Sequence, residues 1–423
     1  MRNVGVLLCL MACQEAGPTY HQDVAPLLGA RCVTCHAEGG IGPFTLDSYE
    51  GASDAADLVA LVAQSRTMPP WGAETHGMTY ADDPSLSDAQ ITMLKAWAAA
   101  GAPEGDPDTP GPELPSLGAE LSRVDVTLEM PEAYTPVRQP DDYRCFVLDW
   151  PETEDVYVTG FAPRPGNTAI VHHMAAFLFA PNGLLGTSVF DDLEAWDEAE
   201  EGPGYTCFGG PSGPNAAQQV PAQQLAQWVP GSGAVVFPEG TGIKVPAGSK
   251  IVLQMHYNVP LASGADQSAL DVQTAPTVER DASFSPFLDG LWPLGNMALP
   301  AGQTTTVSVQ RDPRGFADLL VDDNVDIDPG YWMHSVMLHM HRLGQTGTVN
   351  LHRASGEVVP LLHVPRYDFD WQLVYRFAEP VRFEDGDEIE LACTYNNVTD
   401  AEVNWGEGTG DEMCVANFFI SEF

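Results

Sequence analysis

Short apolar runs separated by turn residues occupy the chain from residue 119 to its end. Many of these runs are bounded by Gly, Pro, Asn or Asp, which is the pattern of short β-strands. No long helical period interrupts them, so two antiparallel, jelly-roll-like β-sandwiches are expected, with a boundary near residue 280. The expected strands span residues 124–128, 157–160, 170–179, 234–237, 251–258, 304–310, 333–342, 371–377, 389–394 and 414–420.

Residues 19–106 differ because their apolar positions recur at helical spacing. A helix that begins near Thr19 is expected to kink at Pro26, and Ser87 with Gln90 forms a capping-box signature for a last helix. The fold class is therefore multidomain, with a small all-α domain ahead of the two β-sandwiches.

The stretch 103–118 is acidic and proline-dense, so it cannot hold a helix and is interpreted as a semi-rigid linker. In a polyproline conformation of about 3.1 Å per residue it can hold the helical domain near the β-sandwiches or well away from them. The expected organisation is a signal peptide and lipid tether (1–18), a helical domain (19–106), a linker (107–118) and two β-sandwiches (119–280 and 281–423).

The chain is strongly acidic, with 59 Asp and Glu against 18 Lys and Arg and a formal net charge of -41. Such a field repels nucleic acid and anionic membrane surfaces, so a nucleic-acid-binding function is excluded. The acidity indicates a soluble, salt-tolerant exterior, and steering of a basic electron donor is the second interpretation.

The first thirteen residues contain one Arg and an apolar run too short to span a bilayer, which is typical of a secretory signal. Residues 10–13, Leu-Met-Ala-Cys, resemble a bacterial lipobox, in which Cys13 is lipidated and becomes the mature N-terminus. The alternative is an ordinary signal peptide with a chance cysteine. The expected location is the periplasm or cell surface, with a lipid anchor in the outer membrane.

The motif Cys32-Val-Thr-Cys35-His36 is typical of covalent haem attachment, in which two thiols form thioethers and the histidine ligates iron. The rival interpretation, a redox or zinc Cys-x-x-Cys, lacks a second metal-binding pair nearby. Together with G-P-F-x-L at 42–46 and M-P-P-W at 68–71, the motif resembles the class I cytochrome c family over about residues 19–106.

A haem of this type usually takes a second axial ligand. Met68, on a proline-stiffened loop downstream of the motif, is the expected one. The alternatives are His76, Met78 or an open position.

Four further cysteines, Cys145, Cys207, Cys393 and Cys414, form an even set in a chain expected to be exported. Disulfides are therefore expected. Sequence alone allows three pairings of the four.

His339 and His341 lie in an apolar run, so in an extended strand both side chains project from one face and can bind one ion together. Met413 is the expected third ligand, because a thioether favours Cu(I) while imidazoles also accept Cu(II). The alternative is a pair of packed histidines without a metal.

Upstream, His172, His173 and His256 are expected to form a three-imidazole copper site without sulfur, suited to cycling between Cu(II) and Cu(I). Adjacent residues on a strand point to opposite faces. His172 and His173 can therefore share an ion only if the backbone is bulged or twisted there, or if one of them lies at a strand end.

These motifs resemble the copper type II, ascorbate-dependent monooxygenase family. The matching segments are H-H-M at 172–174, L-Q-M-H-Y at 253–257, H-x-H-x-L-G at 339–344 and D-E-M-C at 411–414, and the resemblance covers roughly the last three hundred residues. It implies a three-histidine copper that stores an electron, a His-His-Met copper where O2 and substrate meet, and hydroxylation of a C–H bond with ascorbate as donor.

The resemblance also selects the disulfide pairs Cys145–Cys207 and Cys393–Cys414. It points to Gln254, which matches a position considered an electron or water relay in the family; the alternative is a glutamine that satisfies a backbone group.

Departures from the family bear on the substrate. Met337 stands where peptidylglycine enzymes carry an Arg that pairs the substrate carboxylate, and Val415 and Asn417 replace an Asn and a Tyr. A C-terminal peptide is therefore not expected, and a small neutral or apolar molecule fits better.

The expected protein is an exported, lipid-anchored monooxygenase with two copper ions and one covalently bound haem c. Its partners are O2, a small-molecule substrate and an electron donor, supplied through the haem, by ascorbate or by an external protein. The competing interpretation is a non-catalytic haem and copper redox lipoprotein that transfers electrons or binds copper.

Overall fold

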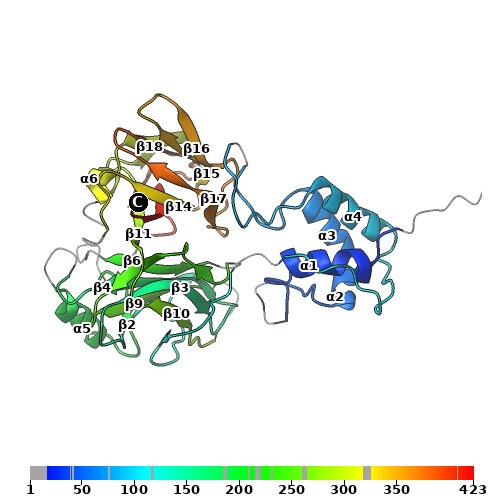
Figure 1. The fold of residues 1–423 in the computed structure, drawn as a ribbon, viewed down its shortest axis with the longest axis horizontal. Coiled ribbons are helices and arrows are strands. Elements are labelled where there is room, and N and C mark those ends of the chain that lie inside the picture. The colour runs from blue at the N-terminus through cyan, green and yellow to red at the C-terminus, as the bar shows by residue number, and fades with distance from the viewer. Residues whose placement is uncertain are drawn as a thin grey trace, which may run out of the picture. The chain divides into compact units, whose positions relative to one another are not determined.

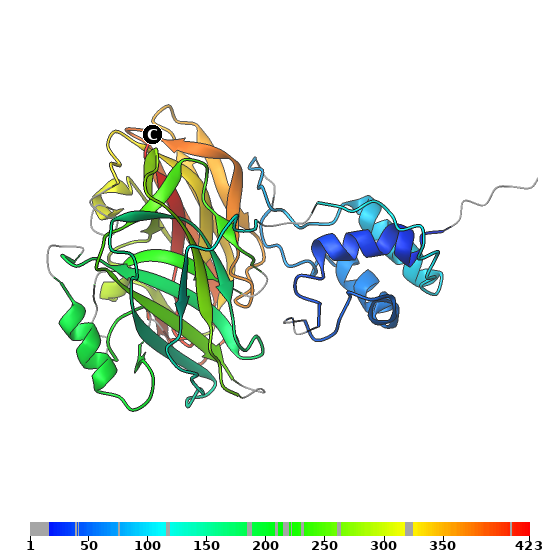
Figure 2. The ribbon, with the colours of Figure 1, turned by 60° about the horizontal axis from the view of Figure 1, so that its bottom comes forward.

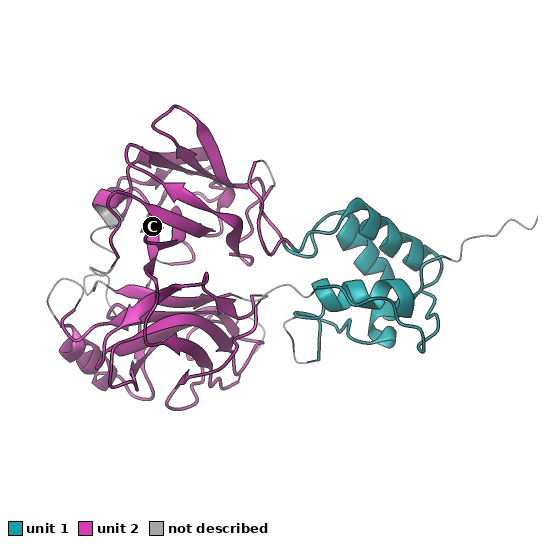
Figure 3. Cartoon of the chain, viewed as in Figure 1, with its two compact units in different colours: residues 1–70, 84–116 teal, residues 71–83, 117–423 magenta. Residues whose placement is uncertain are grey.

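The computed structural model describes residues 17–38, 40, 42–74, 77–115, 119–183, 188–207, 210–214, 220, 222–229, 232–259, 264–317, 325–406 and 408–423. The expected signal peptide and its Cys13 lie outside these residues. The chain divides into two compact units, coloured in Figure 3: unit 1 comprises 1–70 and 84–116, and unit 2 comprises 71–83 and 117–423. Among the described residues, no helix is both long and apolar enough to cross a membrane.

Unit 1 is helical. Its elements are the π-helical turn η1 (Tyr20–Val24) and the helices α1 (Ala25–Arg31), α2 (Tyr49–Asp54), α3 (Ala56–Gln64) and α4 (Asp88–Ala99). The helix expected from Thr19 is interrupted because Pro26, which lacks an N–H, occupies the first turn of α1. Ser87 and Gln90 form the predicted capping box of α4, which buries Leu94 and Trp97.

The proline-dense stretch is held against unit 1 as far as residue 115. Gln22 Nε2 donates to the carbonyl oxygens of Asp106 (2.7 Å) and Thr109 (2.8 Å). The Arg31 guanidinium donates to the carbonyl of Pro115 (2.9 Å). Side chains of the helices thus satisfy carbonyl groups of a segment that forms no helix, and most of the expected linker 107–118 is anchored.

The first β-sandwich of unit 2 packs a five-stranded sheet, ordered β5-β2-β9-β4-β6, against strands β1, β10, β3, β7 and β8 (Figure 1). Its strands are β1 (Val126–Glu129), β2 (Asp141–Asp149), β3 (Val156–Arg164), β4 (Val171–Phe179), β5 (Tyr205–Thr206), β6 (Gln223–Trp228), β7 (Val235–Val236), β8 (Thr241–Val245), β9 (Lys250–Asn258) and β10 (Ala269–Ala275). On β9, Leu253, Met255 and Tyr257 enter the shared core, whereas Val252 packs with Cys145 and Cys207 on the opposite face.

The helix α5 (Phe190–Glu198) was not expected from the sequence. It buries Leu193 and packs Phe190 and Trp196 against the same cluster, but the remaining positions are mostly Asp and Glu and the helix is short, so its apolar period is easily missed. Figure 2 shows this helix, in green, at the periphery of the first sandwich.

The second β-sandwich packs the sheet β13-β18-β15-β16 against β11, β20, β14 and β17, and β12 pairs separately with β19. Its elements are β11 (Arg280–Phe287), η2 (Trp292–Leu294), β12 (Ala298–Leu299), β13 (Thr304–Arg311), α6 (Arg314–Ala317), β14 (Tyr331–His339), β15 (Gly344–His352), β16 (Val358–Val364), β17 (Val374–Phe383), β18 (Glu388–Asn396), β19 (Val403–Asn404) and β20 (Val415–Ser421).

The two sandwiches share one sheet. Strands β8 and β11 pair in parallel, with Arg280 opposite Thr241 and Asp281 opposite Gly242. This pairing joins the halves into a nine-stranded sheet, ordered β1-β10-β3-β8-β11-β20-β14-β17 with β7 on β3. Backbone hydrogen bonds therefore connect the two halves where the sequence predicts a boundary.

Both disulfides implied by the family resemblance are formed, Cys145–Cys207 and Cys393–Cys414. The first links β2 to the segment after β5, and the second links β18 to the residue before β20. The predicted pairing is confirmed.

The segment 71–83 belongs to the second sandwich although it falls within the helical region of the sequence. Tyr80 is 5% exposed and its hydroxyl donates to the carbonyl of Leu361 (3.0 Å). Trp71 packs against Tyr375 with ring centroids 4.8 Å apart. The expected domain 19–106 therefore differs from unit 1, because aromatic burial holds this segment in the core of unit 2.

Tyr80→Ala is expected to release this segment. The loss of a buried aromatic ring and its hydrogen bond should cost about 3–5 kcal/mol of local stability. Hydrogen exchange of the full chain should show faster exchange at the amides of Ala81 and Ala378, which bond across this contact. Leu61→Ala, at a side chain 63% exposed, is the control. Unchanged protection in Tyr80→Ala would contradict the docking.

Candidate metal centres

Strand β4 is bulged at its first histidine. In the antiparallel pairing of β4 with β9, Val171 lies opposite Tyr257 and His173 lies opposite His256, so His172 is an extra residue without a partner on β9. A bulge breaks the alternation of side chains and lets two neighbours turn to one side. The bulge expected if His172 and His173 are to share one ion is confirmed.

The three histidine side chains converge. Nδ1 of His256 lies 3.2 Å from Nδ1 of His172 and 3.2 Å from Nδ1 of His173. One ring nitrogen from each residue lies within 4.8 Å of the others. Burial lowers the pKa of His172 to about 4 and also lowers those of His173 and His256, so all three rings are neutral at pH 7 and have lone pairs to give. This donor set fits a copper ion.

Asp141 orients His256. Nε2 of His256 donates to Oδ1 of Asp141 (3.0 Å), which fixes the tautomer that turns the Nδ1 lone pair toward the other two histidines. This hydrogen bond is the main reason that the pKa of Asp141 falls to about 2. The ring of Tyr143 stacks on the His256 ring, with centroids 4.1 Å apart and planes at 5°.

His339 and His341 lie at the end of β14. The strand ends at His339, three residues earlier than expected. The Tyr367 hydroxyl accepts from the N–H of Met340 (3.0 Å) and donates to its carbonyl (2.7 Å), so both backbone groups of Met340 are bonded to this side chain instead of to a neighbouring strand. The two imidazole centroids remain 5.1 Å apart. Both rings therefore stay within reach of one ion, as the spacing predicts.

Both rings of this pair use Nδ1 for a protein partner. Nδ1 of His339 donates to Oε1 of Gln372 (2.6 Å), and Nδ1 of His341 donates to the carbonyl of Asp411 (3.0 Å). The Nε2 lone pairs are left for a metal. Burial lowers the pKa of His339 to about 3 and also lowers that of His341, so both rings are neutral.

The loop that carries Met413 is tied to the histidine pair. The N–H groups of His341 and Leu343 donate to the carboxylate of Glu412 (2.8 and 2.6 Å), and the Tyr395 hydroxyl donates to the carbonyl of Met413 (2.5 Å). Burial raises the pKa of Glu412 to about 7 despite these donors. Met413 is 8% exposed. Its role as third ligand stays a prediction.

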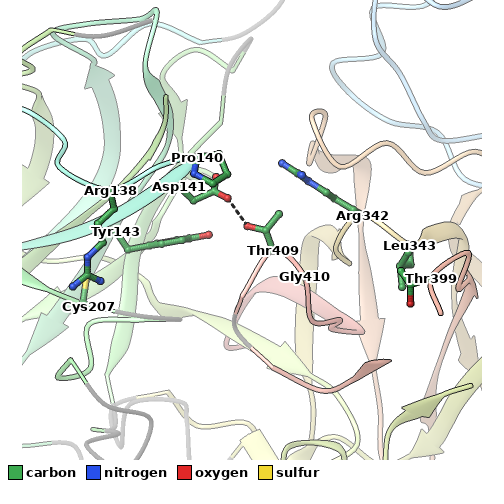
Figure 4. Close-up of a pocket in the computed structure, with 10 residues that line it drawn as sticks. All are labelled: Arg138, Pro140, Asp141, Tyr143, Cys207, Arg342, Leu343, Thr399, Thr409 and Gly410. Atoms are coloured by element: carbon green, nitrogen blue, oxygen red, sulfur yellow. Dashed lines mark hydrogen bonds between the residues drawn. The ribbon is translucent and has the colours of Figure 1, made fainter. Parts of the chain in front are cut away.

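The two centres face each other across the junction of the sandwiches. The ring of Phe369 lies 5.7 Å from that of His172 and 6.0 Å from that of His341, measured between centroids. The Thr409 hydroxyl, near the Met413 loop, donates to Oδ2 of Asp141 (3.0 Å), as Figure 4 shows. A hydrogen bond thus links the partner of His256 to the second sandwich.

Gln254 lies on the predicted face of β9, but its amide is occupied. Nε2 donates to the carbonyl of Gly210 (2.7 Å) and the side chain is 5% exposed. This contact favours the alternative in which the glutamine satisfies a backbone group, and the relay role stays a prediction.

Sequence reasoning missed Asp141, Gln372 and Glu412 as partners of the histidines. Glu412 lies within the D-E-M-C motif, so the sequence itself could have indicated that it lies near the metal centre. Asp141 and Gln372 carry no motif. The pairing of β2 with β9 places Asp141 beside His256, and the loop before β17 places Gln372 beside His339.

In unit 1, Cys32 and Cys35 are free thiols in one turn, in which the N–H of His36 donates to the carbonyl of Cys32 (2.9 Å). Nδ1 of His36 donates to the carbonyl of Phe44 (2.9 Å), which leaves Nε2 free for iron. A Cβ at Gly42 would lie 2.5 Å from His36 Nδ1, so glycine is needed beside the ring. This arrangement fits a covalently attached haem.

The candidates for the second axial ligand fall in different places. Met68 is half-buried in unit 1, whereas Met78 packs against the core of the second sandwich in unit 2. His76 lies outside the described residues. The choice of second axial ligand among these residues stays a prediction, as does the role of the Cys-x-x-Cys-His motif.

A histidine triad and a histidine pair, on two β-sandwiches joined by a sheet, define a two-centre metalloprotein. Comparison with known proteins identifies the family of this metalloprotein. Residues 126–263 match the N-terminal domain of the copper type II ascorbate-dependent monooxygenases, and residues 321–421 match their C-terminal domain. The chain belongs to this family.

Curated relatives agree with this assignment. Human dopamine beta-hydroxylase is 24% identical over 73% of this chain and 47% of its own length. Tyramine beta-hydroxylase of Caenorhabditis briggsae is 23% identical over 74% of this chain and 51% of its own length. The chain thus spans about half the length of these relatives. Among solved structures, allantoicase matches with a TM-score of only 0.17 at 12% identity, over 62% of this chain and 79% of that chain.

Copper binding tests the two centres separately. The wild-type chain is expected to retain two copper ions after dialysis, and His256→Ala one, because the remaining pair of imidazoles at the first centre cannot hold the ion as tightly. Metal analysis of the dialysed protein measures both values. His352→Ala, at a ring that pairs with Glu390 (2.8 Å), should keep two ions. Two ions in His256→Ala would contradict the assignment.

Proposed function

We propose that this chain is a copper-dependent monooxygenase that uses O2 to hydroxylate a C–H bond of a small neutral substrate. The observation that supports it most is the convergence of His172, His173 and His256 in one sandwich, facing His339 and His341 in the other. Family membership supports the same chemistry, and the named relatives are hydroxylases.

The residues have distinct tasks in this proposal. Bound at the two centres, copper ions would each supply one electron for the insertion of one oxygen atom into a C–H bond. The chain fixes the imidazoles: Asp141 and Tyr143 orient His256, and Gln372 orients His339. The disulfide at Cys414 and the carboxylate of Glu412 hold the Met413 loop in place.

The neighbourhood of Met337 supports a neutral substrate with a hydrogen-bond donor. Met337 lies two residues before His339 and opposite Asn417 on β20, and its sulfur accepts from Gln227 Nε2 (3.1 Å). Asn417 Nδ2 donates to Gln224 (2.7 Å), while its buried Oδ1 has no partner among the described residues. A hydroxyl or an amide N–H group of an uncharged substrate would satisfy this oxygen.

Electron supply and location complete the proposal. A haem held by Cys32, Cys35 and His36, with Met68 as its second axial ligand, would provide one-electron input within the same chain, and ascorbate is the alternative donor. Lipidation of Cys13 would anchor the protein to the outer membrane and place it in the periplasm or at the cell surface.

Oxygen uptake by the copper-loaded chain tests the activity. With a panel of alcohols, amides and apolar aromatics, one substrate class should drive O2 uptake and gain one oxygen atom from 18O2 by mass spectrometry. Arylalkylamines, which are cations at pH 7, are the charged comparison, and turnover of these alone would contradict a neutral substrate. Met413→Ala should lower substrate-dependent uptake roughly 100-fold or more, because the substrate-side centre loses its thioether. Met93→Ala, on α4, is the matched control. Full activity in Met413→Ala would contradict the ligand assignment.

Haem attachment is tested independently of copper. The full chain, expressed with a c-type maturation system, should retain haem through denaturing electrophoresis, and the Cys32→Ser, Cys35→Ser double variant should not. Met68→Ala should keep the covalent haem but change its absorption spectrum from low-spin to high-spin. A wild-type protein without covalent haem would rule out the built-in electron source.

A further inference from the structure

One aromatic ring contacts a histidine of each metal centre. The Phe369 ring lies 5.7 Å from the His172 ring, with the planes at 21°, and 6.0 Å from the His341 ring, with the planes at 86°, measured between centroids. Both distances are ordinary for rings in contact, so the two imidazoles are at most about 12 Å apart, the sum of the two distances. None of the tasks assigned above uses Phe369.

The loop that carries Phe369 is fixed to the second sandwich beside its histidine pair. This loop, residues 365–373, connects β16 to β17. The Tyr367 hydroxyl bonds to the N–H (3.0 Å) and the carbonyl (2.7 Å) of Met340, the residue between the two histidines of the pair. The N–H of Tyr367 donates to the carbonyl of Gln345 (2.8 Å). These hydrogen bonds hold the half-buried Phe369 ring in one place relative to the pair.

Gln372 joins Phe369 to the other histidine of the pair. Its Nε2 donates to the carbonyl of Phe369 (3.0 Å), and its Oε1 accepts from Nδ1 of His339 (2.6 Å). The Gln372 side chain is 5% exposed, so this link is shielded from water. Phe369 is therefore connected to both histidines of the second centre, to His341 by ring contact and to His339 through one amide, as well as to His172 of the first.

Hydrogen bonds also join the two centres, over a longer series of residues. This series has three hydrogen bonds of 3.0 Å each and a stretch of backbone, and it runs through His256, Asp141, Thr409, Asp411 and His341. The route through Phe369 needs only two ring contacts. Electron tunnelling weakens with every bond and gap along a route, so the route with fewer steps is favoured.

We propose that Phe369 bridges the two metal centres and carries the electron that passes from one to the other, between His172 and His341. The proposal rests on the proposed function, in which each centre supplies one electron. The step transfers a single electron: the ion at the three histidines passes from Cu(I) to Cu(II), and the ion at the histidine pair passes from Cu(II) to Cu(I). No bond forms or breaks, and the ring itself is left unchanged.

Transfer between the centres can be measured without a substrate. In the anaerobic full-length chain loaded with two Cu(II) ions, a radiolysis pulse that supplies less than one electron per chain reduces one centre first. Freeze-quench EPR then follows the two Cu(II) signals, which differ because the two donor sets differ. The wild type should show a first-order exchange between the signals, at a rate independent of protein concentration. Absence of this exchange in the wild type would overturn the proposal.

Phe369→Leu should keep two copper ions and unchanged EPR parameters but slow the exchange at least about tenfold, because the shorter side chain leaves a gap between the rings. Phe369→Ile is the second variant, should leucine lower the copper content. Phe369→Tyr retains the ring and should exchange at close to the wild-type rate. Phe190→Leu, at a half-buried ring on α5, is the matched control. A wild-type rate in Phe369→Leu and Phe369→Ile would overturn the bridge.

Two further variants separate the routes. His256→Ala should show no exchange, because it keeps one ion, and exchange that persisted there would contradict transfer between the centres. Thr409→Val removes the hydroxyl that bonds to Asp141 and should slow the exchange less than Phe369→Leu does. The reverse order would overturn the Phe369 route in favour of the hydrogen-bonded one. A failed hydroxylase proposal would appear separately, as absent substrate-dependent O2 uptake, and would leave this substrate-free exchange unaffected.

Discussion

Three histidines can share one ion in this protein because β4 carries one residue more than β9 can pair. Without the bulge at His172, strand alternation would send His172 and His173 to opposite faces, one into the core and one out. The bulge leaves one residue of β4 unpaired on β9. On the other side of β9, β2 pairs with β9 without a register shift over its whole length. The rigid β2–β9 pairing holds His256 in register while β4 adjusts to it.

Backbone pairing and side-chain contacts both hold the second metal centre in position relative to the first. Parallel pairing of β8 with β11 makes one sheet of the two sandwiches, and the hydrogen bond from Thr409 to Asp141 connects the Met413 loop to the partner of His256. Two centres whose rings lie on either side of Phe369 need such coupling, because small rotations of one sandwich would separate them. The polar contacts that fix the imidazoles are partly buried, where an unmatched partner is costly.

The sequence predicts the β-architecture, both disulfides and the convergence of each histidine cluster, since these depend on local alternation and on motifs of the family. It does not predict Asp141 or Gln372, because their contacts come from strand and loop pairings between segments far apart in the chain. It misplaces the segment 71–83 for a related reason: Trp71 and Tyr80 contact Tyr375 and its neighbours, a pairing across about three hundred residues that no periodicity reveals. The roles of Met413, Gln254 and the haem ligands remain predictions.

Anomalous X-ray diffraction at the copper edge from crystals of the copper-loaded chain tests the central claim most directly. Two peaks are predicted, one among the Nδ1 atoms of His172, His173 and His256, and one at Nε2 of His339 and His341 within bonding distance of the Met413 sulfur, about 2.3–2.7 Å. A single peak, or a second peak without Met413 in its coordination sphere, would contradict the account.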